Sequence, residues 1–169
     1  MLFLTIGTLL GFDRLVRAMD EAIASGQIDQ EVFAQIGPGS YIPRHMKHVQ
    51  VLAQDDFDRI LASADGLISH AGIGSINAAL KSQRPMVVLP RLKRFGEHVN
   101  DHQLHTAQKF EALGCVLVAY ETSELPARCA QLKSFRPTPR TANLVGLVQG
   151  VRAALTELDI SPVQNRIQR

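Results

Sequence analysis

A chain of 169 residues, 46% of them hydrophobic, is long and apolar enough for one globular domain with a buried core. Its charged fraction of 20% argues against intrinsic disorder. The formal net charge of +2 is too small to indicate a nucleic-acid partner, and we expect none.

The apolar N-terminus and the two cysteines bear on the cellular compartment in which the protein is expected. The first ten residues follow no basic segment and end at Gly11-Phe12-Asp13 rather than at a cleavage site, so they predict a buried strand and not a signal peptide. No apolar run approaches the roughly 20 residues that cross a bilayer. Cys115 and Cys129 have no spacing typical of a disulfide framework. We therefore expect a cytoplasmic protein.

Short apolar runs alternate with segments of helical periodicity along the whole chain. The runs predict strands at residues 2–6, 32–36, 49–52, 66–69, 86–89 and 115–119. The periodic segments predict helices at residues 12–25, 55–63, 75–82, 97–113, 123–134 and 142–158. Because this alternation requires crossover connections, we expect an α/β fold: a single Rossmann-like domain, with a mainly parallel sheet and helices on both faces.

The predicted domain takes up the whole chain, 1–169, with a core over about 1–120 and C-terminal helices over about 121–160. Ligands of such sheets bind beyond the carboxyl ends of the strands. The residues that follow the strands are therefore the candidates for a site: Gly7 and Thr8, the segment 69–75, and the segment that begins at Pro90 and Arg91.

The segment 65–75 takes a buried strand through a glycine turn directly into a helix. Gly72 and Gly74 let a ligand approach the backbone, and the helix N-terminus offers unpaired N–H groups and a positive dipole end. Ser75 can cap this helix or donate to a phosphate oxygen. The pattern favours a diphosphate, and the alternative is a tight structural turn with a capping serine. His70 directly precedes the turn, so both a structural and a ligand-side role stay open for it.

The turn does not match the motifs of other nucleotide-binding proteins. In the Gly-x-Gly-x-x-Gly fingerprint of dinucleotide-binding domains, a third glycine would occupy position 77, which is Asn77 here. A Gly-Lys-Ser/Thr sequence, which a P-loop requires, occurs nowhere in the chain. A dehydrogenase-like domain is therefore disfavoured.

Three histidines follow the strand at 86–89. His98, His102 and His105 have spacings of four and three, which place them on one face of the predicted helix 97–113. Such a row could bind zinc, but the glutamate of a His-Glu-x-x-His motif is missing and no cysteine lies nearby. We therefore expect no metal, and either a polar face toward a ligand cleft or a solvated helix face.

These motifs, taken together with their order, resemble the donor-binding C-terminal domain of family 28 glycosyltransferases. The similar segments are Ser69-His-Ala-Gly-Ile-Gly-Ser75, Pro85-Met-Val-Val-Leu-Pro90 and Asp101-His-Gln103. Plant UDP-glycosyltransferases carry a similar order. Three further segments are similar to the catalytic small subunits of two-subunit N-acetylglucosaminyltransferases of lipid-linked oligosaccharide synthesis: residues 3–8, 12–15 and 96–103. They are also similar to the bacterial counterparts of these subunits in exopolysaccharide synthesis. The resemblance covers residues 1 to about 120.

The resemblance implies the C-terminal half of a GT-B fold and a split, inverting hexosyltransferase that uses a UDP-sugar. The partner would be a membrane-anchored, acceptor-binding glycosyltransferase subunit that recruits this chain to the cytoplasmic face of the membrane. That partner would bind the polyprenyl-diphosphate-linked sugar acceptor. No cofactor is implied, and no metal ion is expected to be required. The alternative is a non-catalytic nucleotide-binding or regulatory subunit that kept the fold.

The resemblance also assigns the donor-binding residues. Thr8 and the turn residues Gly72, Gly74 and Ser75 would face the diphosphate, with His70 beside the phosphates or the sugar. The segment Asp101-His102-Gln103 would hydrogen-bond the sugar hydroxyls, mainly through Asp101 and Gln103.

One departure from the family pattern affects the contact with the ribose, and the resemblance does not identify the catalytic base. Many relatives have a glutamate three residues after the serine that contacts the ribose, whereas this chain has Ala78. The ribose contact would then come from elsewhere, with Asn77 as the candidate, or the usual ribose clamp is absent. Arg91, near Lys93 and Arg94, would suit a carboxylate sugar such as glucuronate, although another hexose would also fit. His98 and Glu97 are the candidates for the base, unless the partner supplies it.

Overall fold

The computed structural model describes residues 1–138 of the chain. Within them, strands form one sheet in the order β3-β2-β1-β4-β5-β6, and all neighbouring strands are parallel. The strands are β1 (Leu2–Thr5), β2 (Val32–Gln35), β3 (Lys47–Val49), β4 (Gly66–His70), β5 (Met86–Leu89) and β6 (Leu117–Val118). The predicted parallel, Rossmann-like sheet is thereby confirmed.

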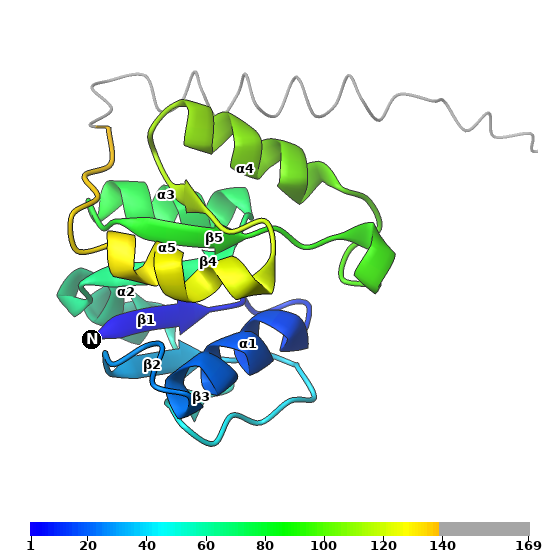
Figure 1. Cartoon of the computed structure of the whole chain (residues 1–169), viewed down its shortest axis with the longest axis vertical. Coiled ribbons are helices and arrows are strands. Elements are labelled where there is room, and N and C mark those ends of the chain that lie inside the picture. The colour runs from blue at the N-terminus through cyan, green and yellow to red at the C-terminus, as the bar shows by residue number, and fades with distance from the viewer. Residues whose placement is uncertain (139–169) are drawn as a thin grey trace, which may run out of the picture. The chain divides into compact units, whose positions relative to one another are not determined.

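Helices cover both faces of this sheet, as predicted. In Figure 1, α1 and α5 lie on the face toward the viewer, and α2 and α3 lie behind the strands. The helices are α1 (Asp13–Ala24), α2 (Gln54–Ser63), α3 (Ile73–Lys81), α4 (His102–Ala112) and α5 (Leu125–Gln131), with short 3-10 turns η1 (Lys93–Phe95) and η2 (Thr122–Glu124). None of the helices within residues 1–138 is long and apolar enough to cross a membrane.

The sheet is apolar on both faces, as expected for parallel strands covered on both sides. Leu2 and Leu4 belong to the core cluster that includes side chains of α1 and α5. Phe3 points to the other face, where its ring lies 6.3 Å from the ring of Phe33 and 5.2 Å from that of Phe57. Alternate residues of the central strand thus anchor two separate apolar layers.

Several predicted elements have other bounds in the structure. The strand predicted at 115–119 is shortened to β6 (Leu117–Val118), and the helix predicted at 123–134 is shortened to α5 (Leu125–Gln131). The run predicted at 49–52 lies later than the observed strand, because β3 pairs with β2 through Lys47 to Val49 and leaves Val51 exposed. The helix predicted at 97–113 begins only at His102. Gly96 has a φ of +68°, which ends the 3-10 turn η1 in a conformation that a continuous helix excludes. The predicted helix 142–158 lies outside the described residues.

The strand order places the topological switch point between β1 and β4. β1 pairs with β2 on one side and with β4 on the other, so the chain runs outward in opposite directions from this pair. Crevices form at such points beyond the carboxyl ends of the strands. The loop after β1 and the turn after β4 are therefore the positions where the fold itself favours a ligand.

We predict that truncating Phe3 destabilises the domain strongly. The side chain is fully buried between two other phenylalanine rings, and Phe→Ala changes at such sites cost about 3–5 kcal/mol of unfolding free energy. Leu9→Ala is the matched control, since Leu9 is 88% exposed and its loss should change stability by less than about 0.5 kcal/mol. Equal effects of the two variants in urea denaturation would contradict the assigned core.

Candidate functional site

A cavity of about 540 Å³ opens at the switch point, beyond the carboxyl ends of β1, β4 and β5. Its wall combines the loop after β1, the turn after β4, the start of the loop after β5, and residues of α2, α3 and α4. The residues predicted from the sequence that line it are Thr8, His70, Gly74, Ser75, Arg91, His98 and Gln103. The fold thus gathers these segments into one site.

The other predicted site residues do not line the cavity. Gly72 lies against the ring of His70, and the side chain of Asn77 has a buried Oδ1 without a hydrogen-bond partner. Asp101 accepts a hydrogen bond of 2.8 Å from the backbone N–H of Lys93. His102 is the first residue of α4 and is half-buried. Glu97 forms an ion pair, described below.

The glycine turn leaves the N-terminus of α3 open. The residue before the helix is Gly72, and no side chain caps the helix end. The first N–H groups of a helix have no partner within it, and here the earliest backbone bond into the turn comes from Ile76. Gly74 is exposed, and no atom lies within 4 Å of the position that a Cβ would take. A ligand can therefore approach this helix end directly.

Ser75 does not cap this helix. α3 begins at Ile73, so Ser75 is its third residue rather than the residue before it, and of the two roles left open by the sequence that of a cap is wrong. Its hydroxyl lies 3.4 Å from His70 Nε2 and lines the cavity. The serine is consequently available to a ligand.

The imidazole of His70 fits because two loops contribute glycines beside it. A Cβ on Gly72 would overlap His70 Cε1, and one on Gly7 would lie 3.2 Å from Nε2. Gly7 also has a φ of +79°, which disfavours other residues. Burial, and secondly the charge of Arg91, lowers the pKa of His70 to about 4. The ring is therefore neutral at pH 7.

Arg91 supplies a buried positive charge to the cavity wall. Its side chain is only 4% exposed, and Nη2 donates to the carbonyl oxygens of Ile6 (2.8 Å) and Leu10 (2.7 Å). Burial lowers its pKa, and no ion pair within residues 1–138 involves it. Its Nε is buried and has no hydrogen-bond partner among residues 1–138. The site thus contains a cation whose charge is not neutralised by a carboxylate of its own.

Gln103 joins the ends of two strands. Its Oε1 accepts hydrogen bonds from the backbone N–H groups of Ala71 (3.1 Å) and Arg91 (3.2 Å), which follow β4 and β5. The side chain is buried and also lines the cavity. Because the oxygen is occupied twice, the amide NH₂ is the part of Gln103 that a ligand can use.

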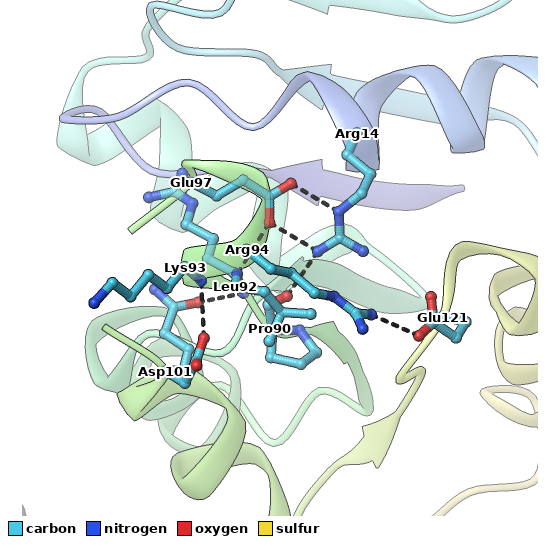
Figure 2. A network of polar contacts seen from close by, with 10 residues as sticks. Arg14, Pro90, Leu92, Lys93, Arg94, Glu97, Asp101 and Glu121 are labelled. Atoms are coloured by element: carbon cyan, nitrogen blue, oxygen red, sulfur yellow. Dashed lines mark hydrogen bonds and ion pairs between the residues drawn. The ribbon is translucent and has the colours of Figure 1, made fainter. Parts of the chain in front are cut away.

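Glu97 lies in a network rather than in the cavity wall (Figure 2). One carboxylate oxygen accepts from Arg14 Nε at 2.7 Å, and the other accepts from Arg14 Nη2 at 2.9 Å. The second oxygen also accepts from the backbone N–H of Leu92. With both oxygens engaged, this geometry favours a structural role for Glu97 over that of a base.

His98 lines the cavity and has one ring nitrogen fixed. Its Nδ1 lies 3.1 Å from Asn100 Oδ1, which also accepts from the backbone N–H of His102. Because an amide oxygen only accepts, this hydrogen bond requires the proton on Nδ1, and the tautomer with one proton then has Nε2 as an acceptor. This is the tautomer that a general base requires.

The predicted row of three histidines is not formed. His98 precedes α4, whereas His102 and His105 lie within it, so the expectation of a common helix face is wrong. No group of three or more histidine, cysteine, aspartate or glutamate side chains in the described part of the chain is placed to hold a metal ion.

The residues that β2 and α2 contribute to the cavity wall were not among the predicted site residues. Gln35 is buried at the end of β2, where its Nε2 donates to Thr5 Oγ1 (3.1 Å) and its Oε1 accepts from the N–H of Leu52 (3.0 Å). Gln54 and Phe57 of α2 complete this side. The signal that could have found it is the pair of polar residues, Thr5 and Gln35, at the ends of two apolar strands.

We predict that His70 makes the fold sensitive to acid. Its pKa is about 4 in the folded protein against an ordinary value of 6.5, so the stability that the neutral ring contributes is complete above pH 6.5 and is lost as the pH falls through 4. The full shift corresponds to about 3 kcal/mol. In urea denaturation, His70→Asn should lose less stability than the wild type between pH 6.5 and 4, and the exposed-site variant His48→Asn should behave like the wild type. An unchanged pH dependence in His70→Asn would contradict a buried neutral imidazole.

A sequence model described as the glycosyltransferase family 28 C-terminal domain matches residues 1–144. The human UDP-N-acetylglucosamine transferase subunit ALG13 is 25% identical over 168 residues, which cover 88% of this chain and 14% of that protein. The chain therefore spans only a small part of that curated relative.

Solved structures share the fold. The NMR solution structure of ALG13 is similar with a TM-score of 0.59 and 22% identity, over 89% of this chain and 94% of that one. The glycotransferase of kitacinnamycin gives a TM-score of 0.57 and 23% identity, over 92% of this chain and 39% of that one. MurG of Acinetobacter baumannii gives 0.52 and 17%, over 88% and 49%. These likenesses show a Rossmann-like domain of the kind that forms the C-terminal half of GT-B enzymes.

The family match covers most of the chain, and the glycine turn at the open helix end lies within it, beside a cavity at the switch point of the sheet. The chain belongs to glycosyltransferase family 28, whose C-terminal domain it matches.

Proposed function

We propose that this chain is the donor-binding, catalytic subunit of a two-component inverting glycosyltransferase. It moves a hexose from a UDP-sugar to a polyprenyl-diphosphate-linked acceptor in exopolysaccharide synthesis. The observation that carries the proposal is that one cavity combines an open helix N-terminus with a buried arginine, Arg91, which forms no ion pair within residues 1–138. Both features favour a ligand with concentrated negative charge.

The diphosphate is assigned to the start of α3. The unpaired N–H groups and the dipole of this helix favour an anion, and Gly74 leaves the approach open. Ser75 and Thr8 add hydroxyl donors on the same cavity wall. The charge of Arg91 acts in a buried setting, where water screens it weakly. These groups support the proposal that the protein binds the phosphates without a metal ion.

The sugar is assigned to the side of Gln103 and His98. The amide NH₂ of Gln103 would donate to a sugar hydroxyl, and a carboxylate sugar such as glucuronate would pair with Arg91. Asp101 and His102 lie outside the cavity wall, so their assignment to the sugar requires the neighbouring loop to approach the donor. Asn77 is assigned to the ribose; it lies outside the cavity wall, next to the wall residue Ala78, so this contact requires its buried side chain to turn toward the donor.

Two chemical tasks follow for an inverting transfer. The departing UDP gains negative charge, which the N–H groups of α3 are placed to stabilise. The acceptor hydroxyl must lose its proton, and among the described residues that line the cavity His98, through Nε2, is proposed as the base. The other source of the base is the partner subunit.

The partner is proposed from the relatives. The human relative is named a subunit, and the ALG13 structure is matched over 94% of its own length, so a chain of this extent is found as a separate structural unit. The proposed partner is membrane-anchored, binds the lipid-linked acceptor, and holds this chain at the cytoplasmic face of the membrane.

A second candidate rests on Ala78. This residue lines the cavity where a carboxylate would contact the ribose, and a methyl group cannot replace those hydrogen bonds. A non-catalytic, regulatory subunit that retains the fold would tolerate this change. A sugar-transfer assay separates the two candidates. If the chain is only a regulatory subunit, substitutions of its cavity residues should leave the transfer rate unchanged.

We predict that the chain binds UDP, and that Gly74→Val weakens the binding by tenfold or more, about 1.4 kcal/mol. No atom lies within 4 Å of the position of a Cβ on Gly74, so the branched side chain of valine is expected to occupy the open approach to the helix end. Isothermal titration calorimetry measures the affinity, and Lys81→Val, on an exposed position of the same helix, is the control. Equal affinities for wild type and Gly74→Val would remove the phosphate site from this turn.

We also predict that transfer requires the partner. Aligning the acceptor hydroxyl with the donor carries much of the rate of a bimolecular transfer, and that alignment is assigned to the second subunit. With radiolabelled UDP-sugars and polyprenyl-diphosphate acceptor, the purified chain should be inactive, and the chain with its partner should be active.

The same assay tests the base. In the assembled enzyme His98→Asn should lower kcat by about 10²–10⁴ and leave the affinity for UDP unchanged. Robust transfer by the isolated chain would contradict the two-component proposal, and full activity of His98→Asn would move the base to the partner.

A further inference from the structure

Two loops at the rim of the cavity are tied together by arginines that reach in opposite directions. The loop at residues 6–12 follows β1, and the loop at residues 90–101 follows β5; both contribute to the cavity wall. Arg91 extends from the second loop to the carbonyl oxygens of the first. Arg14, in the first turn of α1, extends to the second loop, where its Nη2 donates to the carbonyl oxygen of Pro90 at 2.9 Å.

The Arg14–Glu97 pair holds the backbone on both sides of Arg91. Arg14 bonds the carbonyl of Pro90, and Glu97, which Arg14 holds by two hydrogen bonds, accepts from the N–H of Leu92 at 3.0 Å (Figure 2). The side chains of the pair are 17% and 10% exposed. A two-point arginine–carboxylate contact of this kind fixes orientation as well as distance.

Phe12 connects this pair to Arg91 itself. Its buried ring centre lies 5.3 Å from the guanidinium carbon of Arg14 and 5.1 Å from that of Arg91, so both cations contact the same aromatic side chain. The charge of Glu97 additionally favours the charged form of Arg91. Arg14, Phe12 and Glu97 therefore surround Arg91 on the side away from the cavity.

We propose that Arg14 is a positioning residue for the donor site: with Glu97, it holds residues 90–92 so that the Arg91 guanidinium stays against the carbonyls of Ile6 and Leu10 beside the diphosphate. The inference rests on the proposed function for the identity of the ligand. It assigns no contact between Arg14 and the donor, since Arg14 does not line the cavity. Its effect on binding passes through Arg91.

The same loop offers a matched control. Arg94 pairs with Glu121 at 2.8 Å, but these side chains are 58% and 57% exposed and bond no backbone group beside Arg91. Exposed pairs of this kind contribute little to stability. Glu121→Gln breaks this ion pair of the loop without touching the backbone contacts of residues 90–92.

The test compares the double variant Arg14→Met/Glu97→Met with the wild type and with Glu121→Gln. Removing both partners leaves no unpaired buried charge, so the fold is retained more readily than in either single variant. By calorimetry the double variant should bind UDP about tenfold more weakly than the wild type, and Glu121→Gln should bind equally well. Unchanged affinity in the double variant would overturn the proposal.

A thermodynamic cycle distinguishes positioning from a general loss of stability. If Arg14 acts through Arg91, the Arg14→Met/Glu97→Met change should have no further effect on UDP affinity once Arg91→Met is present. An equal loss with and without Arg91 would show that the pair acts elsewhere, which contradicts the proposal.

A measurement without ligand covers the case in which Arg91→Met does not fold or the wild type does not bind UDP. The ¹⁵N signal of Arg91 Nε–H should shift or broaden in the Arg14→Met/Glu97→Met variant and stay in place in Glu121→Gln. An unchanged Arg91 signal in the double variant overturns the positioning role, whatever the ligand. Failure of the wild type to bind UDP contradicts the proposed function alone.

Discussion

The buried guanidinium of Arg91 determines how the loops at the carboxyl-terminal end of the sheet are held together. A cation that is 4% exposed is costly unless its hydrogen-bonding groups are satisfied, and here two carbonyl oxygens of the loop after β1 satisfy one nitrogen. The loop after β1 therefore cannot move independently of the loop after β5. Gln103 adds the end of β4 to the same unit by accepting from Ala71 and Arg91. Three strand ends are thus fixed to each other before any ligand is present.

At this end of the sheet, His70 is a neutral polar group and Arg91 carries the positive charge. Burial and the nearby guanidinium keep the imidazole neutral at pH 7, so the wall carries one fixed positive charge there rather than two. A neutral ring can exchange hydrogen bonds with a hydroxyl such as that of Ser75, whereas a second cation would repel the first. The proposed phosphate contacts then depend on backbone N–H groups of α3 and on one arginine, which do not titrate near neutral pH.

The sequence predicted what depends on local pattern and missed what depends on distant contacts. Apolar periodicity placed β1, β5 and α1 within a residue or two, and the glycine turn identified the helix end that opens into the cavity. The helix predicted from residue 97 failed because Glu97 bonds Arg14, a residue 83 positions away, and Gly96 takes a left-handed backbone. Gln103 was expected to contact a sugar, but no pattern indicated that its oxygen also holds two backbone N–H groups.

The packing of the His70 side chain links positions 7, 70 and 72, the first of which lies far from the other two in the sequence. The imidazole occupies the space that side chains at Gly7 and Gly72 would fill. A large side chain at position 70 therefore requires residues without a side chain at positions 7 and 72. Substitutions at these positions are consequently not independent: a smaller residue at 70 releases the constraint on 72, whereas position 7 keeps its positive φ and stays restricted to glycine. The three positions therefore form a single packing unit that joins the ends of β1 and β4.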